Sequence, residues 1–234
     1  MHVTRYLLLS CLFTLAACDP NFEYEAGEAE TRTISEGWPE YGGGQGQRYV
    51  NNTEITKDNI KDLELAWIYK TGDVSDGSDP AIASTSAFEL TPITADGKLI
   101  ICTPFNRVIA LDPLNGGELW QFDPEIDLSG RYANQLVCRG VTHWQDPGAE
   151  PGSACASRIF TATNDGYLIA IDTDSGSICP GFGANGRVNL NKGAGDQKWL
   201  GEYQVTSPPA VISVTSPVAT SDTSKRPVGS NANP

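Results

Sequence analysis

The sequence predicts an all-β fold made of repeated strands, and three observations predict it. Two segments, 97–123 and 157–183, share the order strand, turn, strand ending in Ala-(Leu/Ile)-Asp, glycine-containing turn and further strand. Their Ala-Leu-Asp and Ala-Ile-Asp triplets begin at Ala110 and Ala170, 60 positions apart. An earlier segment, "LELAWIYKTGD", supplies a related strand around Trp67. Short strands and glycine turns at a regular period are typical of a β-propeller or a similar repeat array.

Residues 1–17 are predicted to be a lipoprotein signal peptide. "MHVTR" carries a positive charge, and "YLLLSCLFT" is an apolar stretch too short to span a membrane. The following "LAAC" resembles a bacterial lipobox, in which Cys18 becomes the lipidated first residue; ordinary cleavage after Ala17 is the alternative. Asp19 resembles the residue that keeps such lipoproteins at the inner membrane. We therefore expect an exported, periplasmic chain that a lipid anchor ties to the inner membrane.

Three segments lead from this leader to the first strand. Residues 18–36 are acidic and poor in apolar periodicity, so they are predicted to be a tether. The next stretch, "GWPEYGGGQGQRYVNNTEI", is rich in glycine and turn-forming residues. "TKDNIKDL" predicts a short helical turn with Thr56 as its cap. The strand pattern then runs on, and we assign residues 37–212 to the propeller.

Within the repeats, the turn residues and one tryptophan have expected roles. The aspartate of each Ala-(Leu/Ile)-Asp triplet can bond nearby backbone amides, and the following glycine can take a positive φ angle. Trp120 ends the first repeat and is predicted to wedge between neighbouring blades, with a plain core tryptophan as the alternative. Cys179 holds this position in the second repeat, so a disulfide there is expected to replace the wedge.

Four cysteines of the expected exported chain predict two disulfides. An oxidising compartment favours disulfides, and the sequence alone leaves three possible pairings open. A zinc site is a weaker alternative, because the spacings are wide and contain no Cys-x-x-Cys. The four candidates are Cys102, Cys138, Cys155 and Cys179.

The charge balance excludes one class of partner. The chain has 16 Lys and Arg against 29 Asp and Glu, for a formal net charge of −13. Nucleic-acid binding calls for a clustered basic face, so no nucleic-acid partner is expected.

The stretch "VCRGVTHW", residues 137–144, places an arginine between two core-like segments. If it is a strand, alternation puts Arg139, Val141 and His143 on one face. An arginine rarely points inward unless it is paired. An inward Arg139 therefore predicts an anionic partner opposite it.

Six motifs together resemble a known enzyme family. "GGGQGQRY", "FELTP", "CTPFNRVIALD", "CRGVTHW", "RIFTATNDGYLIAID" and "VTSPP" come in the order found in quinoprotein dehydrogenases that use pyrroloquinoline quinone (PQQ). The sequence is most similar to the membrane-bound glucose/quinate/shikimate branch. The resemblance implies an eight-bladed β-propeller that holds PQQ beside a divalent cation, Ca²⁺ or Mg²⁺. It also implies oxidation of an alcohol, sugar or polyol, with electrons passed to a quinone or a cytochrome.

The resemblance carries three residues over to cofactor binding. Glu89 in "FELTP" matches an acidic residue beside PQQ, Arg139 in "CRG" matches an arginine that contacts it, and Thr206 in "VTSPP" matches a threonine that bonds a cofactor carboxylate. Each has an ordinary alternative: an exposed strand-end glutamate, a salt bridge on a blade face, and a turn hydroxyl. PQQ carries three carboxylates, and a guanidinium binds carboxylates as a bidentate fork.

Two departures from the family pattern limit the assignment. Methanol-type relatives cover the quinone with a disulfide between adjacent cysteines, and this sequence has no Cys-Cys pair. Some sugar-oxidising relatives have a histidine where Trp144 stands, whereas His143 comes one residue earlier. A stacking role for His143 is therefore weighed against an ordinary hydrogen-bonded strand histidine.

The propeller pattern fails after Ile212. Residues 213–234 have a disordered or aberrant composition, rich in Ser, Thr and Pro. The family would place a metal-ligand carboxylate here, so Asp222 is a candidate metal ligand, with a solvated tail as the alternative.

Blades of roughly 40–50 residues leave room for about three or four in this chain. We therefore expect a partial propeller, the N-terminal part of a PQQ dehydrogenase, inactive by itself, with the catalytic base beyond its C-terminus. The rival hypothesis is a non-enzymatic β-propeller lipoprotein scaffold of the outer-membrane assembly type.

Overall fold

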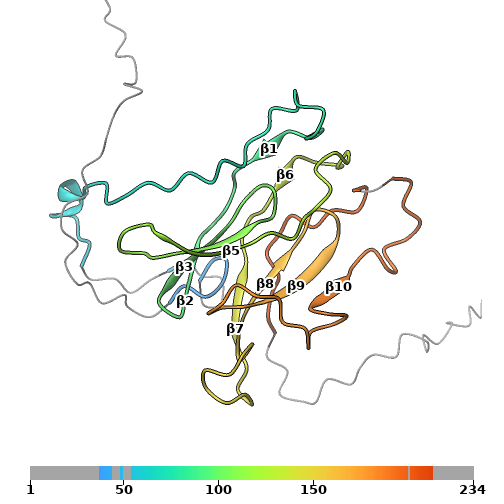
Figure 1. Cartoon of the computed structure of the whole chain (residues 1–234). Helices are drawn as coiled ribbons and strands as arrows, with labels where there is room; N and C mark the ends of the chain where they lie inside the picture. The colour runs from blue at the N-terminus through green and yellow to red at the C-terminus, as the bar shows by residue number, and fades with distance from the viewer. Residues whose placement is uncertain (1–36, 44–47, 50–53, 200, 213–234) are drawn as a thin grey trace, which may run out of the picture.

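The computed structural model describes residues 37–43, 48–49, 54–199 and 201–212. These residues form two four-stranded antiparallel sheets and one two-stranded parallel sheet, without an α-helix among them (Figure 1). The predicted all-β class is confirmed, and the partial propeller takes the form of two adjacent sheets. The two large sheets do not close into a ring within the described residues.

The first large sheet is a simple meander with the order β2-β3-β4-β5. A two-residue turn at Asp96 and Gly97, with φ angles of 47° and 73°, joins its first two strands, as expected of an Asp-Gly hairpin. The pairing of the last two strands is shifted between Ala110 and Leu111. The strands are β2 (Ile93–Ala95), β3 (Lys98–Cys102), β4 (Val108–Leu111) and β5 (Glu118–Phe122).

The second large sheet repeats this arrangement, with neighbours in the order β10-β9-β8-β7. Its two central strands are the longest in the described chain, and a loop of eleven residues, 146–156, precedes the first of them. The strands are β7 (Thr142–Gln145), β8 (Ser157–Ala162), β9 (Tyr167–Asp172) and β10 (Arg187–Asn189).

The main hydrophobic core lies between the two large sheets. Branched aliphatic side chains dominate it, as expected where β-strands pack face to face. Burying one such side chain contributes roughly 1.5–3 kcal/mol, so the contact between sheets is a large part of the stability. The fully buried members are Ile93, Ile100, Cys102, Val108 and Ala110 from the first sheet, Val141 before β7, and Ile159, Ile169 and Ile171 from the second.

Each Ala-(Leu/Ile)-Asp turn receives a tryptophan from the preceding segment. Trp120 donates its indole N–H to the Thr173 carbonyl at 3.0 Å and lies over Gly176. Trp67 does the same with the Pro113 carbonyl, also at 3.0 Å, and lies over Gly116. The predicted wedge role of Trp120 therefore agrees with its position between the two sheets.

The four cysteines form two disulfides and resolve the open pairing. Cys102 pairs with Cys138, and Cys155 pairs with Cys179, with Cα–Cα distances of 6.0 and 5.8 Å. The zinc alternative is therefore wrong for these four residues. Cys179 bonds the Ala170 carbonyl through its N–H, in the place that Trp120 takes in the first repeat, as the repeat predicted.

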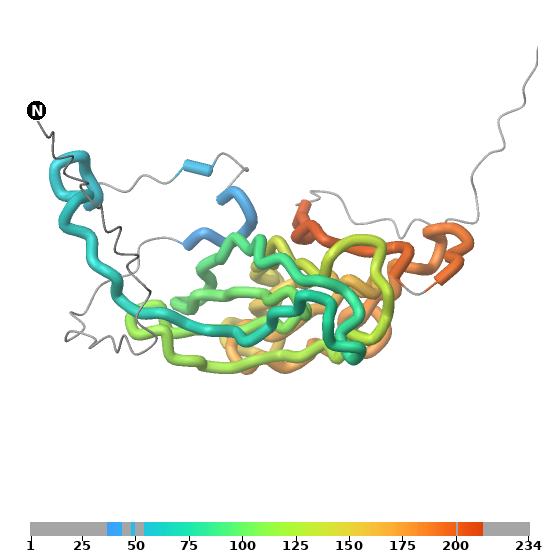
Figure 2. The backbone as a smooth tube through the Cα atoms, turned by 90° about the horizontal axis from the view of Figure 1, so that it is seen from above, coloured from blue at the N-terminus to red at the C-terminus, as the bar shows by residue number. Residues whose placement is uncertain are grey.

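One expectation for the N-terminal part is wrong, and another is met only in part. Residues 63–73 run extended along the first sheet but form no described strand, because no neighbouring strand pairs with them (Figure 2). The helical turn exists as the 3₁₀-helix η2 (Ile60–Asp62), but Asn59 occupies its cap position. Thr56 caps the turn just before it: its Oγ1 accepts the Asp58 N–H at 3.3 Å, and its carbonyl accepts the Ile60 N–H.

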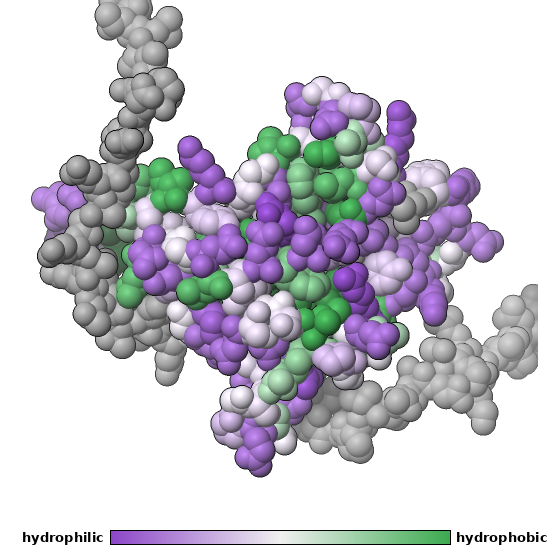
Figure 3. Space-filling view, viewed as in Figure 1, coloured by the Kyte–Doolittle hydropathy of each residue, from purple (hydrophilic) through white to green (hydrophobic). Residues whose placement is uncertain are grey.

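Several predictions lie outside the described residues and stay predictions. They are the signal peptide 1–17, Cys18, the tether that follows it, the tail 213–234 and Asp222. Where the structure does describe the chain, it contains no helix long and apolar enough to cross a membrane. The face seen in Figure 3 is mainly hydrophilic, with small hydrophobic patches between.

Candidate functional site

A parallel pair of short strands positions two of the three candidate residues. β1 (Ser86–Ala87) pairs with β6 (Leu136–Val137), at an offset of 50 positions. Parallel strands run in the same direction, so the residues that follow them leave the pair at the same end. Glu89 and Arg139, each two residues beyond its strand, therefore come to lie side by side.

The Arg139 side chain bonds both of the other candidates, Glu89 and Thr206. Its Nε donates to Glu89 Oε2 at 2.8 Å, and its Nη1 donates to Thr206 Oγ1 at 2.7 Å. The Thr91 N–H also donates to the Arg139 carbonyl at 3.0 Å, which ties the "FELTP" segment to the "CRG" segment. Three motifs that are far apart in the sequence thus meet at one guanidinium.

These residues line a cavity of about 320 Å³ with a mainly polar wall. This volume is at the lower end of the range for small-molecule sites. Arg139 Nη2 has no hydrogen-bond partner among the described residues, so it remains available to a ligand. The lining residues are Glu89, Asn134, Gln135, Val137, Arg139 and Thr206.

The expected burial of Arg139 is wrong. Its side chain is 41% exposed and that of Glu89 is 45% exposed. Residues 138–141 belong to neither β6 nor β7, so strand alternation does not apply at Arg139. The guanidinium is therefore partly exposed to solvent, and an anion bound in the cavity would cover it.

A chain of hydrogen-bonded amide side chains connects the buried core to the wall of the cavity. Asn106 Oδ1 accepts the backbone N–H and the side-chain N–H of Asn164, at 2.7 and 2.8 Å. Asn164 Oδ1 in turn accepts from Gln204 Nε2 at 2.6 Å. Both asparagines are fully buried. Gln204 also bonds the Gln135 carbonyl and the Asn134 N–H, so the segment that carries Thr206 is fixed against the cavity wall.

Sequence reasoning missed the two amide side chains of the cavity wall, Asn134 and Gln135. Both come shortly before "CRG", on the segment that leads into β6. Their amide groups offer further hydrogen-bond donors and acceptors beside Arg139. The available signal was only their nearness to the arginine motif, because single amides in a loop carry no spacing pattern.

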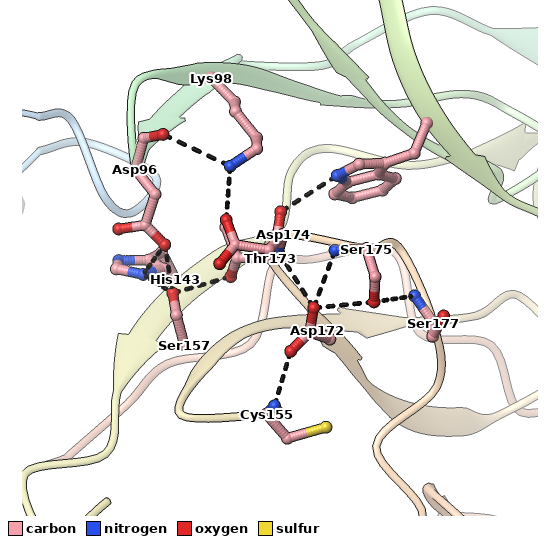
Figure 4. A network of polar contacts seen from close by, with 11 residues as sticks. Asp96, Lys98, His143, Cys155, Ser157, Asp172, Thr173, Asp174, Ser175 and Ser177 are labelled. Atoms are coloured by element: carbon pink, nitrogen blue, oxygen red, sulfur yellow. Dashed lines mark hydrogen bonds and ion pairs between the residues drawn. The ribbon is translucent and has the colours of Figure 1, made fainter. Parts of the chain in front are cut away.

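His143 and Trp144 lie elsewhere. His143 Nε2 is 2.8 Å from Ser157 Oγ and 3.7 Å from Asp96 Oδ2, in a polar network between the two sheets (Figure 4). Trp144 contacts the Arg158 guanidinium, whose Cζ lies 4.9 Å from its ring centroid. Neither residue lines the cavity, so the ordinary hydrogen-bonded alternative holds for His143.

The network around His143 predicts acid sensitivity. Burial lowers the pKa of His143 below 6.5, while the Asp96 carboxylate opposes this shift. The folded state then binds fewer protons than the unfolded state, so the free energy of unfolding should fall as the pH drops below about 6.5. The other charged groups of the network, Lys98 and Asp174, pair at 2.7 Å.

Urea unfolding at about pH 7.5 and about pH 5.5 measures this effect. The His143→Gln variant should lose less stability over this interval than the unsubstituted chain. Equal losses in the two proteins would assign the acid sensitivity to other groups.

A larger cavity of about 450 Å³ lies beside Arg107, but its arginine is already engaged. Arg107 forms a bidentate pair with Asp73, at 2.8 and 2.6 Å, and also donates to Gln121 and to the Thr71 carbonyl. The bond to Asp73 raises the pKa of Arg107 further, despite its partial burial. A guanidinium with a carboxylate already in its fork offers little to an anionic ligand.

The described residues contain no cluster of three or more His, Cys, Asp or Glu that could hold a metal ion. Glu89 is the only acidic residue that lines the smaller cavity. The described wall of this cavity offers one cationic donor, Arg139, to an anionic organic group.

The fold and the site define a β-propeller-type protein with an arginine-lined polar cavity, and comparison with known proteins agrees. A family model described as glucose/ethanol/alcohol dehydrogenase, beta-propeller domain matches residues 38–231. The chain belongs to this family of PQQ-dependent quinoprotein dehydrogenases. The matched range continues beyond Ile212 into the segment predicted to be a tail.

The relatives are named as dehydrogenases of glucose, of quinate and shikimate, and of alcohols. The chain is 37% identical to the quinoprotein glucose dehydrogenase of Escherichia coli (strain K12), over 80% of this chain and 24% of that protein. It is 32% identical to the quinate/shikimate dehydrogenase (quinone) of Acinetobacter baylyi, over 76% and 23%. The solved quinohemoprotein alcohol dehydrogenase of Comamonas testosteroni matches with a TM-score of 0.56 and 27% identity, over 75% and 22%. The chain thus spans about a quarter of the length of these relatives.

Proposed function

We propose that this chain forms part of the PQQ-binding wall of a dehydrogenase that oxidises an alcohol, sugar or polyol. The single observation that supports this proposal best is the meeting of Glu89, Arg139 and Thr206 at one polar cavity. These three residues lie in separate sequence motifs, and their grouping is not expected in a scaffold that does not bind PQQ.

The donor set suits an anionic quinone with carboxylates. Arg139 Nη2 is free to donate, and the Thr206 hydroxyl can donate its own proton while it accepts from Arg139. The Asn134 amide adds a further donor at the wall. Charge-assisted hydrogen bonds of this kind are about twice as strong as neutral ones, so a carboxylate would find its main binding energy at Arg139.

Each residue has a distinct task in this proposal. Arg139 binds a cofactor carboxylate, and Glu89 orients the guanidinium by accepting from Nε. Thr206 accepts from Nη1 and so holds the other end of the guanidinium. When bound, PQQ supplies the ortho-quinone that takes up two electrons from the substrate, while the protein orients it. We assign these residues to binding and orientation and not to proton transfer.

The cellular setting is part of the same proposal. Two disulfides suit an oxidising compartment, which supports export to the periplasm. The lipobox-like "LAAC" supports lipidation at Cys18, with a tie to the inner membrane. We further propose a quinone or a cytochrome as electron acceptor and Ca²⁺ or Mg²⁺ as the accompanying cation, on the strength of family membership.

A titration with PQQ tests the proposed function. PQQ added to the purified full chain should quench its tryptophan fluorescence with a saturable dependence, and equilibrium dialysis should give the same Kd. A related control is an aromatic tricarboxylate without a quinone, which separates general anion binding from cofactor binding. Failure to bind PQQ at millimolar concentration would overturn the proposal and favour the non-enzymatic scaffold.

A further inference from the structure

The two disulfides occupy different kinds of position. Cys102 ends β3 in the first sheet, and Cys138 directly follows β6 on the way to the second sheet. This bond therefore links the first large sheet to the segment that leads from β6 into the second large sheet, next to the candidate site. The other bond joins Cys155, in the loop before β8, to Cys179, in the connection between β9 and β10, so both of its ends lie in loops of the second sheet.

The first disulfide lies one residue from Arg139. Its two cysteines are 0% and 4% exposed, so the bond is held within the main core. Outside the ladders of the sheets, the backbone of residues 138–141 makes one hydrogen bond to the rest of the described chain, from the Thr91 N–H to the Arg139 carbonyl. The covalent bond at Cys138 is therefore a main restraint on the backbone that carries the guanidinium.

The side chain of Arg139 cannot supply this restraint itself. It is 41% exposed, and its ion pair with Glu89 is as open to water. Exposed ion pairs typically contribute between 0 and about 1 kcal/mol, which is too little to fix a long side chain by themselves. The direction of the guanidinium must depend on where the backbone places its Cα, and the disulfide fixes the residue just before it.

We propose that the Cys102–Cys138 disulfide is a positioning crosslink for Arg139. It holds the segment between β6 and β7 so that the guanidinium reaches Glu89 and Thr206 and presents Nη2 to the cavity. This inference rests on the proposed function only for its effect on PQQ. Its geometric content, the placement of Arg139, stands apart from any ligand.

The first measurement follows Arg139 directly. In ¹⁵N NMR spectra, the Arg139 Nε–H signal, assigned by its loss in Arg139→Lys, should be shifted and slow to exchange in the unsubstituted chain, because it donates to Glu89. The Cys102→Ala/Cys138→Ala variant should show this signal at the position of a free arginine. The matched Cys155→Ala/Cys179→Ala variant should keep it unchanged. An unchanged signal in the first variant would overturn the proposal, whether or not PQQ binds.

The second measurement follows the ligand. Loss of the Cys102–Cys138 bond should weaken PQQ binding about 3- to 10-fold, and loss of the other bond should weaken it less than about twofold. In the Arg139→Gln background, removal of the first disulfide should cause no further loss, because the crosslink acts through that arginine. Additive losses would contradict a positioning role and indicate a general effect on folding.

Two controls keep the outcomes distinct. The Cys102→Val/Cys138→Ala variant refills part of the space of the sulfurs and carries both measurements if the alanine pair does not fold, as judged by near-ultraviolet circular dichroism. If the unsubstituted chain does not bind PQQ, the proposed function fails, and the Nε–H signal still decides the positioning claim.

Discussion

Replacement of Arg139 by Gln is expected to weaken PQQ binding by about 10- to 100-fold, with little change in the thermal midpoint. Hydrogen bonds to charged groups contribute about 1.5–3 kcal/mol, which corresponds to this range. The effect on folding should be small, because the Arg139 side chain is 41% exposed and its ion pair is solvated. Fluorescence titration and a thermal melt on the same samples measure both quantities.

The matched control for this substitution is Arg158→Gln. Arg158 also pairs with a carboxylate, Asp146 at 3.1 Å, but it does not line the cavity. This variant should bind PQQ as the unsubstituted chain does. Arg139→Lys should fall between the two, because lysine keeps the charge and loses the planar fork. Equal weakening by the two glutamine substitutions would show that net charge matters and not the cavity.

Replacement of Gly176 by Ala should lower the free energy of unfolding by about 2–5 kcal/mol. Gly176 has a φ of 70°, and a Cβ there would lie 2.7 Å from Cδ2 of Trp120. An alanine would therefore have to adopt an unfavourable backbone angle and displace a packed indole. Urea unfolding of the two proteins gives the difference.

The hairpin residue Gly97 provides the control for this prediction. Its φ of 73° is nearly the same, but no atom lies within 4 Å of a Cβ built there. Gly97→Ala should therefore lower the free energy of unfolding only by the cost of the positive φ angle, about 1–2 kcal/mol. In a Trp120→Ala background, Gly176→Ala should fall to this smaller value. Equal losses of unfolding free energy at the two glycines would show that the contact with Trp120 adds nothing to the cost at Gly176.

The repeated turns were the most predictable part of the fold, because their chemistry is local. Asp112 accepts the Leu114 N–H at 2.8 Å, and Asp172 accepts the Ser175 N–H at 2.8 Å, as the Ala-(Leu/Ile)-Asp pattern indicates. The glycine four residues later follows from the same pattern, whereas the contact of each turn with a tryptophan more than 40 residues away does not. The aspartate and the glycine of each turn lie within a few residues of each other, so a single sequence is enough to identify them.

The parts that the sequence left open or that were predicted wrongly depend on distant neighbours. The pairing of Cys102 with Cys138 follows from how two sheets meet, which spacing cannot show. Residues 63–73 have strand-like composition but need a partner strand to form a ladder. Arg139 was placed on a strand because its neighbours alternate, whereas the chain leaves β6 just before it.

The grouping of Glu89, Arg139 and Thr206 came from motif resemblance, and the parallel register explains how the fold achieves it.

The central claim is that Arg139 receives a carboxylate of PQQ. A crystal structure of the full chain soaked with PQQ tests it most directly. We expect the ligand in the cavity beside Asn134, with one carboxylate within hydrogen-bond distance of Arg139 Nη2 and of the Thr206 hydroxyl. PQQ bound at another place, or an Arg139 still paired only with Glu89 and Thr206 at full ligand occupancy, would contradict the account.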